Sequence, residues 1–285
     1  MKENNFIMKN ITEEEKNMAV VIDISKHQST LKIEQIIKWY KAKLINGVIV
    51  RATWGTNEDI MFKYFATTLK NADIPFGVYT YSYALSTKSG LNECAKLHEV
   101  LIKYDVKPLL PVYIDMEDAD HWKEKRGKLS SFPFIDICGQ FCSYFENLKY
   151  YTGIYANDSW FGSYLKSSKL DKYDKWVANW STSPRNVSKY GMHQFTNKYR
   201  LTGYNDNLDA SSMKYDYPAI IKKNGLNGYG EKEEEKEEII DYEDLYIETR
   251  KELEDTKKDL IDTENDMNSF KETLEQIEAI LSSKK

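Results

Sequence analysis

Short apolar runs alternate with amphipathic stretches over the first three quarters of the chain. The apolar runs predict strands at residues 20–25, 47–53, 76–84, 110–118, 152–156, 175–180, 192–196 and 207–210. Helical spacing of apolar side chains predicts helices over residues 33–44, 59–71, 91–103 and 134–148, with room for one short helix within 157–174. Several runs are apolar throughout, as expected of parallel strands that are buried on both faces.

The last predicted strands follow one another too closely for helices between them. The connections 181–191 and 197–206 are too short for the crossover helix that a parallel pair needs. We therefore predict an α/β fold of five βα units followed by three strands, an irregular (β/α)5(β)3 barrel of the TIM type. An open doubly wound sheet is the alternative, and it is less favoured because no predicted strand leads into a glycine-rich phosphate-binding loop.

A different pattern begins after residue 224. The sequence GLNGYG and the charged run after it predict a linker over residues 225–238. Apolar residues then recur every seven positions, at Ile239, Tyr246, Leu253, Leu260, Met267, Leu274 and Leu281. A second set follows three positions later, at Tyr242, Thr249, Thr256, Thr263, Phe270 and Ile277. These heptads predict a C-terminal α-helical coiled coil in residues 239–285, which joins copies of the chain through residues 239–281. A single amphipathic helix packed on the barrel would use the same pattern.

Composition and charge support this division. Residues 1–17 are polar and lack the apolar core of a secretory signal, so we expect a disordered extension before a barrel domain at residues 18–224. Hydrophobic residues make up 41% of the chain, which is enough for a sizeable core. Residues 231–285 hold 20 acidic and 9 basic side chains, a net charge of −11, whereas the preceding part carries +6. A basic front part suits an anionic polymer, either nucleic acid or bacterial cell wall, and a merely basic surface without such a partner is the alternative.

Several classes of protein are excluded. No apolar run approaches the roughly 18 residues that span a bilayer, so no membrane partner is expected. The three cysteines, Cys94, Cys138 and Cys142, form no CxxC pair, and the four histidines show no metal-ligand spacing. These counts argue against zinc-dependent hydrolases and disulfide-rich secreted modules, and we expect no metal or cofactor.

The sequence VYIDMED at residues 112–118 carries the clearest chemical signal. In a strand, Tyr113, Asp115 and Glu117 would share one face, while the apolar residues between them would face the helices. Two carboxylates on one face repel each other, so a purely structural strand rarely has them. At the carboxyl end of a barrel strand they indicate catalysis. Solvated acids at a surface strand end are the alternative.

Two more carboxylates are expected near this pair. Asp23 lies inside the apolar run VVIDI, and Asp209 lies near the end of the last predicted strand. First and last strands are neighbours in a closed barrel, so all four acids would line one mouth. For Asp23 alone a hydrogen-bonded buried acid is the alternative, and for Asp209 alone a turn or cap.

Four carboxylates without ligand histidines favour glycoside hydrolysis, which needs one protonated and one ionised carboxyl group. Aromatic faces that suit sugar rings stand at other strand ends, at Tyr79, Tyr81, Tyr155 and Trp180. Ordinary core packing is the alternative for each of these aromatic residues.

Taken in order, these pieces resemble lysozymes of glycoside hydrolase family 25, the Chalaropsis-type muramidases of phages and Gram-positive bacteria. The matching pieces are VIDIS (21–25) with Gln28, IVRAT (49–53) with Gly55, GVY (77–79), DME (115–117), GIY (153–155), WVANW (176–180), QF (194–195) and Asp209. They cover about residues 20–210. Thr80 departs from the family pattern, which often has His there, and the heptad tail departs from the wall-binding repeats of many relatives.

The resemblance implies an endo-acting N-acetylmuramidase that cuts β-1,4 bonds in peptidoglycan. Glu117 would be the general acid, Asp115 would stabilise the sugar's developing charge or orient its N-acetyl group, and Asp23 and Asp209 would complete the acidic site. By the same resemblance Tyr79, Tyr81, Tyr155, Trp180 and Gln194 would bind the glycan. Whether an enzyme carboxylate or the substrate's acetamido oxygen attacks the sugar stays open.

Two other functions compete with this one. A catalytically silent barrel would hold wall glycans while the coil multimerises it, and a chitinase-like hydrolase would cut another N-acetylated glycan. The pair of Asp115 and Glu117 argues against the silent barrel, because a protein without catalysis has no reason to keep two carboxylates that repel each other. The absence of the DxxDxDxE motif argues against the chitinase-like hydrolase. Without a secretory signal, we expect a phage endolysin that stays in the host cytoplasm until a holin releases it to the wall. We expect peptidoglycan, and not nucleic acid, as its partner.

Overall fold

The computed structural model describes residues 19–180, 183–230 and Lys271. The chain divides into two units, Met1–Glu231 and Lys232–Lys285, and only Lys271 of the second unit is described. The extension predicted at residues 1–17 and the coiled coil predicted at 239–285 therefore lie outside the described residues.

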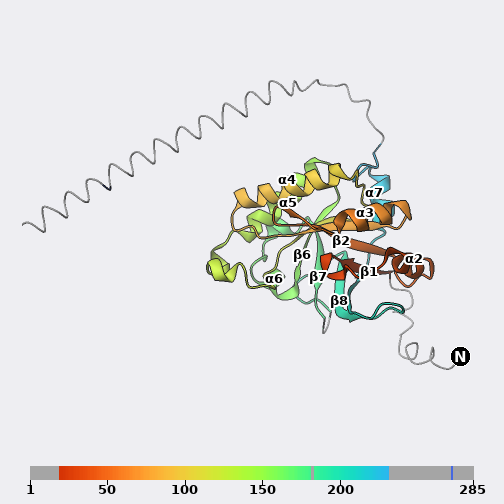
Figure 1. Cartoon of the computed structure of the whole chain (residues 1–285). Coiled ribbons are helices and arrows are strands. Elements are labelled where there is room, and N and C mark those ends of the chain that lie inside the picture. Colours follow the sequence, from red (N-terminus) through yellow and green to blue (C-terminus); the bar gives the residue numbers. More distant parts are fainter. Residues whose placement is uncertain (1–18, 181–182, 231–270, 272–285) are drawn as a thin grey trace, which may run out of the picture. The chain divides into compact units, whose positions relative to one another are not determined.

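The first unit alternates strands and helices (Figure 1). Its strands are β1 (Ala19–Ile24), β2 (Gly47–Trp54), β3 (Asn57–Glu58), β4 (Phe76–Tyr81), β5 (Val112–Asp115), β6 (Thr152–Asn157), β7 (Asp174–Ala178), β8 (Met192–Tyr199) and β9 (Leu208–Met213). Its α-helices are α2 (Ile33–Lys41), α3 (Phe62–Asn71), α4 (Thr87–Lys103), α5 (Phe134–Asn147), α6 (Asp158–Gly162) and α7 (Tyr217–Lys223). The order gives five βα units and then three strands, as predicted.

Eight of the strands form a closed barrel. The pairing order is β1-β9-β8-β7-β6-β5-β4-β2, and β1 also pairs with β2, which closes the ring and excludes the open doubly wound sheet. The short β3 only extends β2. Neighbouring strands are parallel from β1 through β8, whereas β9 runs antiparallel to both of its neighbours. The β7–β8 pair is parallel although the described residues of its connection contain no helix, so our expectation that parallel pairing needs a helix fails there.

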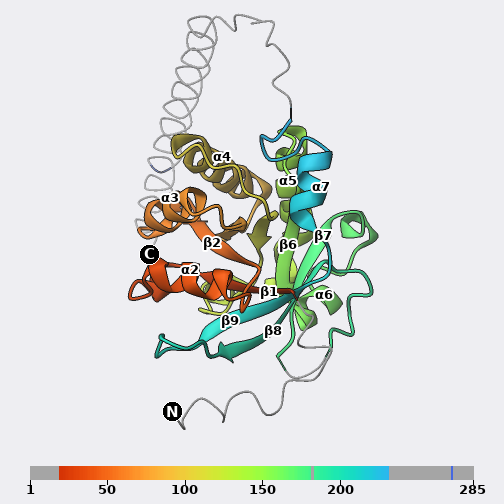
Figure 2. The same ribbon diagram turned by 90° about the vertical axis from the view of Figure 1, so that its right-hand side faces the viewer.

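The strands that helices cover are more deeply buried than the strands without helices. Helices α3 and α4 pack on β2, and α5 packs on β5 and β6, so these strands are buried on both faces (Figure 2). Strands β8 and β9 lie side by side in Figure 2 and keep several half-exposed positions. Side chains fill the inside of the barrel, and Gly153 makes room for them: a Cβ atom there would lie 2.6 Å from the Tyr113 ring.

The floor of the barrel, at the amino ends of the parallel strands, is closed by residues that sequence patterns did not reveal. Helix α7 was not predicted, yet its Tyr217 is buried and its hydroxyl donates to Asp174 at 2.5 Å. Residues 225–230, predicted as linker, instead pack on the floor. The buried Asn227 donates to the carbonyl of Pro108 at 2.7 Å and accepts from the backbone N–H of Tyr151 at 2.7 Å.

Four strands end earlier than predicted, namely β1, β4, β5 and β7, and the shifts in β5 and β7 affect residues of the site. Strand β5 ends at Asp115, so Glu117 lies in the segment after the strand rather than within it. Strand β7 ends at Ala178, and Trp180 lies beyond it. Both shifts place side chains of the site on loops at the barrel mouth.

Candidate active site

A cavity of about 420 Å³ opens at the carboxyl ends of the parallel strands. Every site residue predicted from the sequence lines it: Asp23, Tyr79, Tyr81, Asp115, Glu117, Tyr155, Trp180, Gln194 and Asp209. They come from seven elements or the segments after them, so only the closed barrel brings them together. Another cavity, of about 380 Å³, is lined by Lys166, Lys175 and Lys189 and contains none of these residues.

The four carboxylates come from three strands, β1, β9 and β5, or from the segment directly after β5. Asp23 on β1 and Asp209 on β9 are direct partners in the antiparallel ladder. Asp115 is the last residue of β5, and Glu117 follows two positions later. Asp23 and Asp115 are buried, with 8% and 5% of their surface exposed, whereas Glu117 and Asp209 are half-buried. The cavity is therefore a pit, and its two deeper acids, Asp23 and Asp115, are largely shielded from solvent.

Burial raises the pKa values of all four acids, and repulsion by other acids adds to the shifts of Asp23, Asp115 and Glu117. Burial raises the pKa of Asp115 well above its usual range, and the charge of Glu117 adds to the shift. Burial raises the pKa of Glu117 to about 7, against the opposing charge of Lys123. The pKa of Asp209 rises to about 6 through burial, and that of Asp23 is raised by burial and by Asp209. Near neutral pH this pit therefore retains protons, and Glu117 is a half-buried carboxyl group that can donate one.

Gln194 connects three other residues of the pit through hydrogen bonds. Its Nε2 donates to Asp23 Oδ2 at 2.9 Å, and its Oε1 accepts from Tyr155 Oη at 3.0 Å and from Trp180 Nε1 at 3.0 Å. The first bond steadies a buried carboxylate, and the other two fix aromatic side chains on the cavity wall. Gln194 therefore orients neighbouring groups, in addition to facing the cavity.

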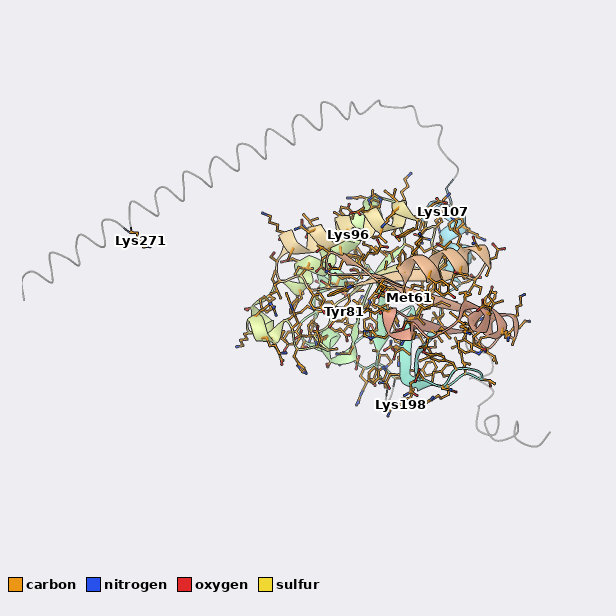
Figure 3. The ribbon with its side chains drawn as sticks, viewed as in Figure 1. Met61, Tyr81, Lys96, Lys107, Lys198 and Lys271 are labelled. Carbon is orange, nitrogen blue, oxygen red and sulfur yellow. The ribbon has the colours of Figure 1, made fainter. Side chains whose placement is uncertain are left out.

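The aromatic residues differ in how much surface they offer. Tyr79 and Tyr155 are buried against Trp176, with ring centroids 6.1 and 4.5 Å apart, so packing accounts for much of their role. Tyr81, labelled in Figure 3, is half-exposed and donates to Asp120 at 3.3 Å. Trp180 is 56% exposed and is therefore free to contact a ligand.

Sequence reasoning missed two cations at this site. Arg51 lines the cavity, and its Nε lies 2.7 Å from the fully buried Asp59. Its position inside the apolar run of β2 was a usable signal, because an inward-facing cation there needs a partner. Lys123 lies beneath the rim and donates to the backbone carbonyl of Glu117. It comes from an irregular polar segment with no periodic pattern that would single it out.

A second hollow extends the site. This hollow, of about 510 Å³, shares Glu117, Tyr155 and Trp180 with the first cavity and continues over Asn157 and Ser159. The two hollows meet at Glu117, so a ligand can extend to both sides of that carboxyl group.

Among residues 19–180, 183–230 and 271, no group of three or more His, Cys, Asp and Glu side chains is arranged to hold a metal ion. Within those ranges, no helix has both the length and the apolar surface for a membrane span.

Comparison with known proteins gives a consistent result. A sequence profile described as glycosyl hydrolases family 25 matches residues 22–204. No curated protein matches the chain significantly. Among solved structures, a modular autolysin from Streptococcus pneumoniae in complex with a synthetic peptidoglycan ligand is 24% identical, with a TM-score of 0.61. The match covers 69% of this chain and 47% of the autolysin, so the chain spans about half the length of that protein.

Two shorter relatives are covered almost completely. The catalytic domain of an endolysin from a bacteriophage of Listeria monocytogenes is 25% identical, with a TM-score of 0.56, and the match covers 72% of this chain and 97% of that domain. A bacterial lysozyme from Streptomyces coelicolor is 18% identical, with a TM-score of 0.56 and coverage of 74% and 98%. Because the profile spans more than half of the chain and the barrel and its carboxylates agree with it, the chain belongs to the glycosyl hydrolases of family 25.

Proposed function

We propose that this protein is an endo-acting N-acetylmuramidase that hydrolyses the β-1,4 bonds between N-acetylmuramic acid and N-acetylglucosamine in peptidoglycan. The observation that carries the proposal is the half-buried Glu117, whose pKa of about 7 leaves a proton available beside the buried Asp115. Family membership supports the reaction class, and the pneumococcal relative was solved with a peptidoglycan ligand.

In this mechanism Glu117 donates its proton to the glycosidic oxygen as the bond from the sugar carbon to that oxygen breaks. Positive charge develops on the sugar ring, and the neighbouring carboxylates stabilise it. The ionised Glu117 then takes a proton from the water that completes hydrolysis, which restores the starting state.

Asp115 has a feature suited to substrate contact. Its Oδ1 is buried and has no hydrogen-bond partner among the described residues. An unpaired buried oxygen is costly unless a ligand supplies a donor. The acetamido N–H of the sugar is such a donor, so we assign Asp115 the role of orienting that group.

The two hollows that meet at Glu117 support the endo mode. A strand lying along both would present an internal bond to the acid. Trp180, exposed where the hollows join, would stack on a sugar ring next to the bond that is cut.

We further propose that the protein is a phage endolysin that reaches the wall after a holin opens the host membrane, and that residues 239–281 join copies of the chain. The first proposal is supported by the likeness to the endolysin catalytic domain. The second rests on the heptad pattern alone, because those residues lie outside the described ones.

The test is digestion of purified Gram-positive walls, followed by borohydride reduction and mass spectrometry of the fragments. A muramidase leaves N-acetylmuramic acid at the new reducing end, so reduced fragments end in N-acetylmuramitol. Glu117→Gln is the matched control, because it keeps the shape of the side chain but has no acidic proton to donate to the glycosidic oxygen. Fragments that end in reduced N-acetylglucosamine, or cleavage of chitin oligosaccharides alone, would contradict the proposal. Sedimentation with walls and no cleavage would indicate a silent binding module.

A further inference from the structure

Lys123 is a fully buried lysine, with 0% of its surface exposed, immediately behind the acidic pit. Its Nζ donates to the backbone carbonyl of Ser82 at 2.6 Å and to that of Glu117. Ser82 follows β4 and Glu117 follows β5, so a single ammonium group ties together two adjacent segments of the mouth. One of its two acceptors belongs to the proposed general acid.

The surroundings of this ammonium group are anionic and aromatic. Among the described residues, no carboxylate lies within 4.0 Å of Nζ as an ion-pair partner. Carboxylates act on it from a greater distance, from Asp115, Asp118, Glu93 and Glu117 in that order. The rings of Tyr81 and Tyr83 lie 5.3 and 5.7 Å from Nζ, which suits a cation.

A second buried acid supports the same corner from behind. Glu93 on α4 is 4% exposed, accepts from Ser82 Oγ at 2.6 Å and accepts from the backbone N–H of Tyr83 at 2.8 Å. The segment after β4 is therefore fixed to α4 by Glu93, and the segment after β5 is fixed to it by Lys123. The backbone at Glu117 is held on a rigid support.

A buried ammonium group is an expensive way to join two carbonyl groups. Burial of a charge without a directly paired anion is destabilising, and a neutral amide would make the same two hydrogen bonds at lower cost. The positive charge therefore has a use that the hydrogen bonds do not explain. The nearest use is to offset the negative charge of the pit.

We propose that Lys123 is a positioning residue of the hydrolase, which fixes the backbone of Glu117 and supplies the positive charge that keeps the carboxylates of the pit from all retaining protons together. The inference rests on the proposed role of Glu117. It goes beyond that role because it assigns a function to a further residue, Lys123, which does not line the cavity.

The consequence for proton affinity has a definite sign. The charge of Lys123 opposes the effect of burial on the pKa values of Glu117 and Asp115. Removing it raises both, so the pit would retain its protons to higher pH. The other charged or titratable groups that face the pit are Asp23 on β1, His27, Arg51 on β2, Tyr79 and Tyr81 on β4, Asp118, Asp120, Tyr155 on β6 and Asp209 on β9. All of these side chains are still present after a substitution at Lys123.

The experiment uses the full chain and its Lys123→Met variant, which keeps most of the length of the side chain but removes its charge and its two hydrogen bonds. The carboxyl carbon of Glu117 is followed by NMR in protein with ¹³C-labelled glutamate, and its signal is assigned by its disappearance in Glu117→Gln. We expect its titration midpoint to rise by roughly one pH unit, the size of effect that one nearby opposite charge produces. The alkaline limb of the wall-lysis profile should move in the same direction.

Lys175 provides a matched control. It is also buried, and its Nζ donates to the carbonyls of Leu170 and Tyr173 at 3.0 and 3.2 Å, but it lies outside the pit. Lys175→Met should leave both the midpoint and the limb where they are. Lys123→Arg keeps the charge and should retain the wild-type midpoint even if the rate falls.

The outcomes separate this inference from the proposed function. An unchanged Glu117 midpoint in folded Lys123→Met overturns the inference, whether or not the wild type lyses walls. If that variant does not fold, the ¹⁵N shift of Lys123 Nζ in the wild type decides, because a neutral amine at pH 7 overturns the proposal. A raised midpoint in a protein that never cuts walls supports the role of Lys123 and contradicts the proposed function.

Discussion

Replacing Glu117 with Gln should abolish lysis and also stabilise the barrel at alkaline pH. The pKa of Glu117 is about 7 in the folded protein, against an ordinary value of 4.5. The folded state therefore binds more protons than the unfolded state between these two values. By linkage, the free energy of unfolding falls as pH rises through this window.

The size of the effect follows from the shift in pKa. Each pKa unit corresponds to about 1.4 kcal/mol, so Glu117 should cost the folded protein about 3 kcal/mol above pH 7 relative to pH 4. Gln resembles the protonated carboxyl group and carries no charge at any pH. Glu117→Gln should therefore be more stable than the wild type at pH 8 by up to that amount, and equally stable near pH 4.

Urea unfolding followed by tryptophan fluorescence, at steps between pH 4 and pH 8, measures this difference. Glu34→Gln is a suitable control, because it makes the same chemical change at an exposed position on α2 that does not line the cavity. If Glu117→Gln is no more stable than the wild type at pH 8, Glu117 does not carry an elevated pKa and the argument for its role as general acid fails.

Four further outcomes are expected. Gln194→Leu should lower the lysis rate on the order of tenfold, because Asp23 loses its hydrogen-bond donor; an unchanged rate in purified protein would show that the bond is dispensable. Asn227→Ala should lower the free energy of unfolding by about 2 kcal/mol in urea, because the buried backbone groups that it satisfies lose their partner. Burial raises the pKa of all three thiols, so a thiol reagent should modify none of them in the folded enzyme and all three in denaturant; the thiols are Cys94, Cys138 and Cys142. Light scattering should show an oligomer of the full chain that strengthens as salt screens the net charge of −11 in residues 231–285, and a monomer at both low and high salt would contradict the coiled-coil hypothesis.

The acids of the site were predictable because their cost is visible along the sequence. Asp23 and Asp115 interrupt apolar runs that would otherwise be ordinary buried strands. Because burying a carboxylate is unfavourable, such an interruption indicates a functional site from the sequence alone. Closure of the barrel was predictable from the count of strands and the lengths of their connections. The positions of β5 and β7 were predicted correctly, but not their ends, because Met116 and Trp180 continue the alternation of apolar residues past the last strand positions, Asp115 and Ala178.

The supporting residues were not predictable, because their roles depend on distant contacts. Asn227 reads as part of a glycine-rich linker, and its function becomes clear only when Pro108, more than a hundred positions earlier, lies against it. Lys123 sits among other charged residues, and only the folded loops show that it alone turns inward. Helix α7 is too short for its periodicity to stand out.

The reversed direction of β9 decides where the chain leaves the barrel. Because β9 runs from mouth to floor, its last residue, Met213, pairs with Ala19 and Met192 at the starts of β1 and β8. Helix α7 and Asn227 then stay at the floor, so both residue 19 and residue 230 lie at the end of the barrel opposite Glu117. A fusion partner attached at either position would begin away from the glycan. If β9 ran parallel to its neighbours, the chain would instead leave the barrel at its mouth, beside the bond that is cut.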